Sequence, residues 1–332
     1  MSFKKVASAL VILIALALIL LFFAKQQIED YLTLPRIDKT QLITVPAGSN
    51  FSRLGDDLLA QAIVTDLRWW KVISKLYPEL TKIRSGTYQI KEGFNLQDIL
   101  QTINTGKDFQ FKVTLVEGGT FKEWITILNE AKQLTPLQKT EAELIEALAI
   151  PHDKLEGLLF PETYHYSADM SAFSIIKNAY HHQTSVLNKL WAEREEGLPY
   201  KTPYEALIMA SIIEKESGLS NDRDKISSVF VNRLRINMRL QTDPTVIYGM
   251  GDRYEGRIRK KDLREKTAYN TYTIFGLPPT PIAMPSEAAL YATLHPAKTK
   301  YLYFVSKGDG TSYFSKSLRE HNNAVNKYIR GK

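Results

Sequence analysis

Two carboxyl groups lie two residues apart near the end of a predicted helix, in the segment TPYEALIMASIIEKESG at residues 202–218. Thr202 is suited to cap the start of this helix, and Pro203 is favoured at its first position. The helix is therefore expected to carry Glu214 and Glu216 in its last turns. Glutamates held in this way can donate or accept protons in catalysis.

A helical projection separates the two glutamates. At about 100° per residue, Glu216 falls within the apolar arc of the helix, whereas Glu214 falls on the opposite side. That arc consists of Ala206, Met209, Ile212 and Ile213. Burial and the negative end of a helix both raise a carboxyl pKa, and a carboxyl protonated near neutral pH is what general-acid cleavage of a glycosidic bond requires. The alternative is a structural pair between Glu216 and an arginine, one of Arg233, Arg235 and Arg239.

The composition excludes several other kinds of chemistry. The chain has 332 residues and no cysteine, which rules out disulfides, thiolate zinc sites, iron–sulfur clusters and cysteine catalysis. The neighbouring His181 and His182 point about 100° apart on a predicted helix and cannot share a metal ion. No metal and no cofactor is therefore expected. With 44% hydrophobic and 24% charged residues, the chain is predicted to be globular.

The N-terminal region contains an apolar run, VASALVILIALALILLFFA, at residues 6–24. At about 1.5 Å per residue, a helix of this length nearly crosses a hydrocarbon core of roughly 30 Å. A cleaved signal peptide is the alternative, but its apolar region is usually about 7 to 15 residues long and ends at a small-residue site. Residues 1–25 are therefore predicted to be a cytoplasmic tail and a transmembrane anchor in the lipid bilayer.

The orientation of this anchor is not decided by the positive residues, since Lys4 and Lys5 precede the run and Lys25, Arg36 and Lys39 follow it. A short tail and a long C-terminal part favour a cytoplasmic N-terminus and an extracytoplasmic, periplasmic bulk at the cell inner membrane. The net charge of +7 then suits binding to an anionic polymer or to a membrane surface, and no nucleic acid is expected as a partner. Solubility alone is the alternative reason for the charge.

After a predicted stalk at 26–42, one pattern occurs three times, at 43–59, 87–103 and 112–128. Each copy is a β-prone stretch, a glycine turn and an amphipathic helix. The turn glycines are Gly48, Gly93 and Gly118, and the apolar helix faces are Phe51, Leu54, Leu58; Leu96, Ile99, Ile103; and Phe121, Trp124, Leu128. Such units resemble the LysM-like module of cell-wall proteins, which binds N-acetylglucosamine polymers, and residues 43–109 are assigned to it. A purely structural or docking domain is the alternative.

The remainder, residues 110–332, is predicted to be a mostly helical domain. Extended structure is expected in EGLLFPETYHY at 156–166 and in a C-terminal β-hairpin at 301–315, which turns at Lys307-Gly308-Asp309-Gly310. A closing helix is expected over 319–332. The predicted fold class is therefore α+β, with a transmembrane helix, a small β-α module and a helical domain.

Several long motifs resemble the YceG-like (MltG) family of endolytic murein transglycosylases. They are EGLLFPETY, MASIIEKES, RDKISSVFVNRLRINMRLQTDPTVIYGMG, AYNTYTIFGLPPTPIAMP and HPAKTKYLYFV, and they cover roughly 155–305. One departure from the family is Thr280-Pro281, where members often carry Gly-Pro or Gly-Ala.

The resemblance implies cleavage of the β-1,4 bond between N-acetylmuramic acid and N-acetylglucosamine within peptidoglycan glycan strands, leaving 1,6-anhydromuramic ends. It places the catalytic role on Glu216, the second glutamate of the E-K-E stretch, on a lysozyme-like active-site helix. The resemblance also implies that the protein acts beside peptidoglycan synthases, the penicillin-binding proteins, and terminates nascent strands.

Polar and aromatic side chains in two further motifs are the candidates for substrate binding, because tyrosines stack on sugar faces and polar groups bond to sugar oxygens. They are Gln241, Thr242 and Asp243 of LQTDP, and Tyr269, Asn270, Thr271 and Tyr272 of YNTY. Glu156 and Tyr164 are further candidates. A structural role for all of these is the alternative. If Asp243 acts as a second catalytic carboxylate, a lysozyme-type muramidase results; if nothing is cleaved, the chain is an anchored peptidoglycan-binding protein.

Overall fold

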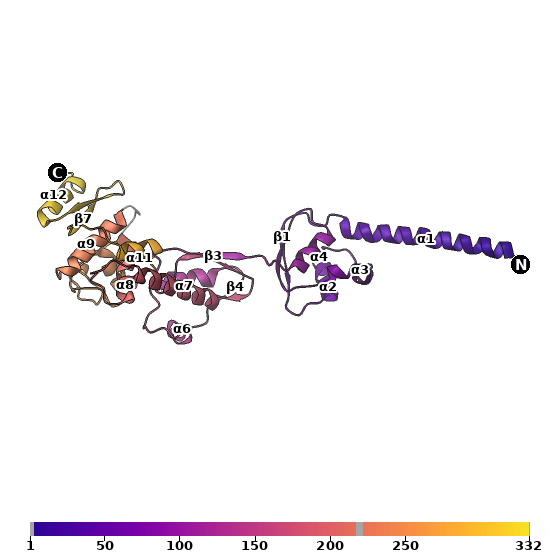
Figure 1. The fold of residues 1–332 in the computed structure, drawn as a ribbon, viewed down its shortest axis with the longest axis horizontal. Helices are drawn as coiled ribbons and strands as arrows, with labels where there is room; N and C mark the ends of the chain where they lie inside the picture. The colour runs from indigo at the N-terminus through magenta and orange to yellow at the C-terminus, as the bar shows by residue number, and fades with distance from the viewer. Residues whose placement is uncertain (1–2, 217–221, 332) are drawn as a thin grey trace. The chain divides into compact units, whose positions relative to one another are not determined.

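A computed structural model describes residues 3–216 and 222–331 and divides the chain into two compact units, Met1–Phe111 and Lys112–Lys332 (Figure 1). Both units combine helices with short strands, and the described residues form four two-stranded sheets. The mixed α and β content expected from the sequence is confirmed.

Helix α1, Phe3–Thr33, contains the apolar run. Among the described residues it is the one helix long and apolar enough to cross a membrane, which fits a single-pass anchor. Its last turns are different, because Ile28, Tyr31 and Leu32 are buried in the core of the N-terminal unit, as is Ile37 after it. The expected stalk at 26–42 is therefore largely part of the folded unit. Its apolar residues at 28, 31 and 32 have helical spacing, and they supply the face that packs.

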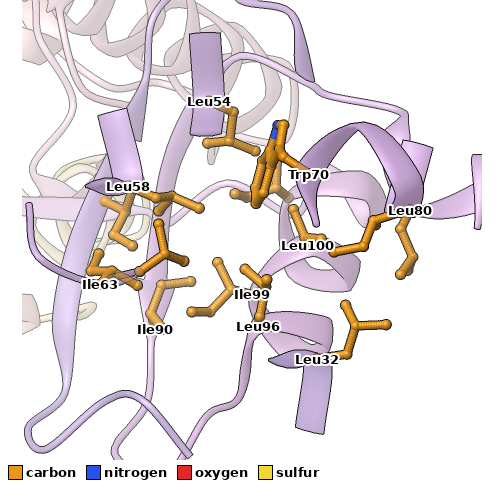
Figure 2. Close-up of a cluster of buried hydrophobic side chains, with 14 of the residues drawn as sticks. Leu32, Leu54, Leu58, Ile63, Trp70, Leu80, Ile90, Leu96, Ile99 and Leu100 are labelled. Atoms are coloured by element: carbon orange, nitrogen blue, oxygen red, sulfur yellow. The ribbon is translucent and has the colours of Figure 1, made fainter. Parts of the chain in front are cut away.

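The N-terminal unit is built around one antiparallel strand pair and a single apolar core. Strand β1, Gln41–Val45, pairs with β2, Gly86–Ile90, so that Ile43 lies opposite Tyr88. The helices of the unit are α2, Phe51–Ala60; α3, Trp70–Leu76; the short η1, Pro78–Thr81; and α4, Leu96–Thr105. Figure 2 shows the core between them, where side chains such as Leu54, Leu58, Ile90 and Ile99 converge.

All three predicted strand–glycine–helix units are confirmed. The third consists of β3, Phe111–Leu115, and α5, Phe121–Glu130, mostly in the C-terminal unit. Each turn glycine has a positive φ that a side chain would disfavour: 77° at Gly48, 81° at Gly93 and 73° at Gly118. Each helix is capped by a side chain, from Asn50, Asn95 and Thr120 respectively. These local signals fix where each strand ends and each helix begins.

The C-terminal unit is arranged around helix α8, Pro203–Glu216. It packs against α7, Ala172–Ala192; α9, Arg223–Arg235; α10, Asp243–Met250; and α11, Glu287–Leu294. Every residue of α8 from Ala206 to Glu214 is buried. A helix with neighbours on all sides has no water-facing side, and this matters for the two glutamates at its end.

Short elements complete the unit. Strand β3 pairs with β5, Glu162–Tyr166, and β4, Leu134–Thr135, runs parallel to β6, Met170–Ser171. Helix α6 spans Glu141–Ala147, and two single turns, η3 and η4, span Gly251–Arg253 and Asp262–Arg264. The predicted C-terminal hairpin is confirmed as β7, Tyr303–Ser306, and β8, Ser312–Ser315, followed by helix α12, Leu318–Tyr328.

Candidate active site

Glu216 is the last residue of α8, and its side chain is partly buried. The Thr242 hydroxyl donates a hydrogen bond to its Oε1 atom. Burial is the largest influence on the Glu216 carboxyl and raises its pKa, and the charge of Asp243 raises it further. The Thr242 hydrogen bond and the charge of Arg233 lower the pKa, but the net change is upward. The carboxyl is thus held toward its protonated form, as a general acid requires.

Glu214 is also buried, with 9% of its surface exposed, which contradicts the expectation that it faces water. Its Oε1 atom lies 3.1 Å from Arg223 Nη2, and its Oε2 atom accepts from the backbone N–H of Ser286 at 2.9 Å and from the Ser286 hydroxyl. The projection failed because it assumed one polar side, whereas α11 covers the side that carries Glu214. With both oxygens occupied by partners, Glu214 holds elements together.

Glu216 lines a cavity of about 380 Å³. Three of the predicted binding residues share this cavity with it: Gln241, Asp243 and Tyr272. The rest of the lining comes from α9, the first residue of LQTDP, the C-terminal hairpin and α12: Phe230, Arg233, Leu240, Tyr303, Phe304, Leu318 and His321. A larger cavity of about 910 Å³ elsewhere in the unit contains none of the predicted residues.

The two motifs LQTDP and YNTY are joined by hydrogen bonds beside Glu216. Gln241, whose φ is 51°, donates its N–H to the Thr271 carbonyl at 3.1 Å. The Thr242 N–H donates to the Thr271 hydroxyl at 3.0 Å, and that hydroxyl lies 2.9 Å from the Thr245 hydroxyl. Thr242 and Thr271 are both buried, so they hold the loop in place, and Thr242 also contacts the Glu216 carboxyl directly.

Asp243 and Tyr272 face the cavity as a pair. The Tyr272 hydroxyl donates to Asp243 Oδ1 at 2.6 Å. Burial, together with the charge of Asp243, raises the Tyr272 pKa, so its hydroxyl stays protonated. The cavity therefore contains a second carboxylate near Glu216, as well as a tyrosine that can contact a sugar.

Tyr269 and Asn270 lie outside the lining of this cavity. The Tyr269 hydroxyl is 2.8 Å from that of Thr280, and its ring centroid is 4.9 Å from that of Tyr248. Asn270 is buried and donates from Nδ2 to two backbone carbonyls, those of Asp262 at 3.1 Å and Glu265 at 2.6 Å. Both residues support the loop that presents Tyr272. Thr280, at the departure from the family pattern, makes a local contact.

Glu156 and Tyr164 also lie outside the Glu216 cavity. Glu156 is 5% exposed; its Oε1 accepts from the Phe121 N–H at 3.1 Å and its Oε2 from the Tyr248 hydroxyl at 3.2 Å. Burial raises the pKa of its carboxyl to about 7. The Tyr164 hydroxyl donates to the Phe160 carbonyl at 2.7 Å. Among the described residues, no group of three or more histidines and carboxylates is placed to hold a metal ion.

Sequence reasoning missed the wall formed by Arg233, Tyr303 and His321. From the sequence, Arg233 is expected only as a structural partner of Glu216, and neither the hairpin nor the closing helix is expected in the site. The guanidinium of Arg233 lies over the Tyr303 ring, 5.2 Å from its centroid, and that ring stacks with His321 at 5.2 Å. No motif signals this stack, because its members come from α9, β7 and α12, which are far apart in the chain.

Comparison with protein families gives a match to the YceG-like family over residues 43–327. The chain is 34% identical to the endolytic murein transglycosylase of Bacillus subtilis (strain 168), over 87% of this chain and 85% of that protein. It is 26% identical to the endolytic murein transglycosylase of Streptococcus pneumoniae serotype 2 (strain D39), over 94% of this chain and 63% of that longer protein.

A solved structure gives a similar result. The crystal structure of a YceG-like protein from Listeria monocytogenes superimposes with a TM-score of 0.53 and 29% sequence identity. The match covers 86% of this chain and 99% of the other. The similarity thus extends over both units.

Proposed function

The chain belongs to the YceG-like family, and from this membership and the Glu216 cavity we propose that it is an endolytic murein transglycosylase. Its substrate is the glycan strand of peptidoglycan, cut at the β-1,4 bond between N-acetylmuramic acid and N-acetylglucosamine. The observation that carries the proposal is a partly buried carboxyl, with its pKa raised by burial, in a cavity lined by polar and aromatic side chains.

In the proposed reaction, Glu216 is both acid and base. Protonated Glu216 donates its proton to the glycosidic oxygen as the bond to C1 of the muramic acid breaks. The resulting carboxylate then takes the proton from the C6 hydroxyl of the same sugar as that oxygen attacks C1. The products are a 1,6-anhydromuramic end and a free N-acetylglucosamine hydroxyl, and Glu216 is again protonated. No water is consumed.

The other cavity residues have supporting roles in this proposal. Thr242 orients the Glu216 carboxyl through its hydroxyl. Gln241 and Tyr272 line the cavity and can bond to sugar oxygens. Asp243, held by the Tyr272 hydroxyl, supplies a negative charge that favours the positive charge developing at C1. Thr271, Tyr269 and Asn270 act through the loops that they hold.

A lysozyme-type muramidase is the second candidate, and the position of Asp243 favours it. Two carboxyl groups in one cavity are the arrangement of a glycosidase that activates water or forms a covalent intermediate. Mass spectrometry of the fragments that the purified chain releases from sacculi separates the two reactions. Fragments with 1,6-anhydro ends support the transglycosylase, whereas fragments with reducing ends contradict it.

The N-terminal unit is proposed to be a LysM-like wall-binding module, and this is supported by its antiparallel strand pair with α2 and α3 between the strands. We place the chain in the inner membrane through α1, with its N-terminus in the cytoplasm and both units outside. There it would cut nascent strands beside peptidoglycan synthases. An anchored protein that only binds the wall would sediment with sacculi and release no fragments.

A further inference from the structure

Arg233 carries a buried positive charge that has no carboxylate partner. The residue is 7% exposed, and within the described part of the chain no carboxylate oxygen lies within ion-pair distance of its guanidinium. A buried charge is costly unless another charge or several hydrogen bonds compensate it. Such a residue is retained in a fold where its charge has a use.

Backbone carbonyls hold this guanidinium in one orientation. Its Nε donates to the Leu302 carbonyl at 2.7 Å and its Nη1 to the Leu240 carbonyl at 2.6 Å. The Tyr303 ring lies beside it, with its centroid 5.2 Å from the guanidinium carbon. Two of the five N–H groups of an arginine are thus used in hydrogen bonds to other described residues, and both bonds go to backbone carbonyls.

Arg233 lines the same cavity as Glu216. The other titratable groups lining that cavity are Asp243 from α10, Tyr272, Tyr303 from β7 and His321 from α12. Burial and the charge of Arg233 lower the pKa of His321, so its ring is neutral near pH 7. Lys215, on the same helix as Glu216, instead donates to the Gly118 carbonyl at 3.0 Å. Arg233 is therefore the fixed cation of this lining.

We propose that Arg233 is a positioning residue that stabilises the carboxylate form of Glu216, the form that exists between the two proton transfers. This inference rests on the proposed role of Glu216 as acid and base. Before the reaction the carboxyl is protonated and Arg233 faces no negative charge except that of Asp243. Once the proton has moved to the leaving oxygen, a carboxylate appears in the same cavity, and the preoriented guanidinium stabilises it without rearrangement.

The direct test follows the titration of Glu216 rather than its activity. The full chain is labelled with ¹³C at glutamate carboxyls, and the Glu216 signal is assigned by its loss in Glu216→Gln. In Arg233→Gln the pKa of Glu216 should rise by roughly one unit, because an opposite charge nearby favours the ionised form. Arg233→Lys should restore part of the shift. Arg239→Gln, which removes an exposed cation outside the cavity, is the matched control and should leave the titration unchanged.

A second measurement needs no substitution at Arg233. In the otherwise unaltered chain, the ¹⁵N signals of the Arg233 guanidinium should shift as Glu216 titrates, and Glu216→Gln should abolish that shift. If the ¹⁵N signals of Arg233 do not change as Glu216 titrates, the inference is overturned, and this result does not depend on whether Arg233→Gln folds.

Kinetics separate this role from substrate binding. In Arg233→Gln, kcat should fall about tenfold with KM unchanged, and the alkaline limb of the pH–rate profile should move up by the same unit as the titration. A raised KM with an unmoved Glu216 titration would overturn the proposal and make Arg233 a ligand for a substrate carboxylate. If Glu216→Gln is fully active, the catalytic role proposed for Glu216 fails; if it is inactive but the titration does not depend on Arg233, only the present inference fails.

Discussion

The two units of this chain have cores of opposite character. In the described part of the N-terminal unit, Thr87 is the one buried polar side chain apart from aromatic residues, and its hydroxyl lies 3.0 Å from that of Thr44. The described part of the C-terminal unit buries four residues of the charged types, Glu156, Glu214, Arg233 and Asp262, and partly buries Glu216. The first core contains no buried charge among its described residues, whereas the second keeps charges away from water at a cost in stability.

The buried charged residues of the C-terminal unit fall into two groups, those whose charge has partners and those that face a cavity. Glu214 has partners for both of its oxygens, and Asp262 accepts the Arg259 N–H at 2.7 Å. Glu216 and Arg233, by contrast, share a cavity and are not paired with each other. Satisfied charges stabilise the fold, and incompletely satisfied charges mark the place where chemistry is expected.

The largest expected effect is a loss of activity without a loss of stability. Glu216→Gln removes the proton that the leaving oxygen needs, so release of fragments from sacculi should fall by about 10² to 10⁴-fold. The thermal unfolding temperature should not decrease, because the glutamine amide is neutral and burying it does not require the desolvation of a charge. Glu130→Gln, at an exposed position, is the control. Activity close to that of the unaltered chain would remove Glu216 from the mechanism.

The neighbouring glutamate should behave in the opposite way. Glu214→Ala removes a buried carboxylate that pairs with Arg223 and accepts from Ser286, and should destabilise the C-terminal unit by about 3 to 5 kcal/mol. Faster amide hydrogen exchange in α8 and α11 would report this. Lys122→Ala breaks the exposed pair with Asp252 and should leave the exchange of α8 and α11 essentially unchanged, because water screens this pair. Unchanged exchange in Glu214→Ala would mean that this buried pair does not hold α8 in place.

A substitution in the apolar core should affect only the N-terminal unit. Leu58→Ala creates a cavity at a fully buried position and should destabilise that unit by about 2 to 5 kcal/mol. Leu59→Ala, at the adjacent position with 39% exposure, should cost less than about 0.5 kcal/mol. Hydrogen exchange of β1 and β2 measures both. Cleavage of soluble glycan strands should be the same in both variants, and a loss of turnover in Leu58→Ala alone would show that the two units do not act independently.

The last expected effect concerns Glu156 and, unlike the others, depends on pH. Its folded-state pKa of about 7 lies above the ordinary 4.5, so the folded chain binds more protons than the unfolded chain between these values. The contribution of Glu156 to the free energy of unfolding is therefore greatest below about pH 4.5, and it falls by about 3 kcal/mol as the pH rises through 7.

Glu156→Gln should abolish that fall, which hydrogen exchange of α5 and α10 at pH 5 and pH 8 can measure. Glu117→Gln changes an exposed carboxyl and should leave the fall intact. An equal pH dependence in Glu156→Gln and the unaltered chain would contradict the assignment of a raised pKa to Glu156.

Local signals in the sequence predicted much of the fold. The three glycine turns, their caps and their amphipathic helices follow from the properties of single residues and from spacings within one helix. The C-terminal hairpin follows from its Gly-Asp-Gly turn. The stalk was misjudged because Ile28, Tyr31 and Leu32 form a packing face too short to stand out in a polar segment.

The site was predictable only in part. The motif that contains Glu216 and the one that contains Asp243 and Tyr272 are each visible in the sequence, and the fold brings these three side chains to one cavity. Tyr269 and Asn270, in the same motif as Tyr272, turn away from it, since neighbouring residues in a loop point in different directions. A motif identifies a segment, but it does not tell which of its side chains face the substrate.

The sequence by itself determined the long apolar helix α1, the repeated β-α units and the helix that ends at Glu216, because short-range spacing and backbone preference decide these features. Only the tertiary structure decided which of the two glutamates is paired and which faces a cavity. That outcome depends on α11 covering one side of α8 and on Arg233, Tyr303 and His321 meeting from three distant segments. Burial and electrostatics at a residue are set by its neighbours in space, and a helical projection includes only the residues of its own helix.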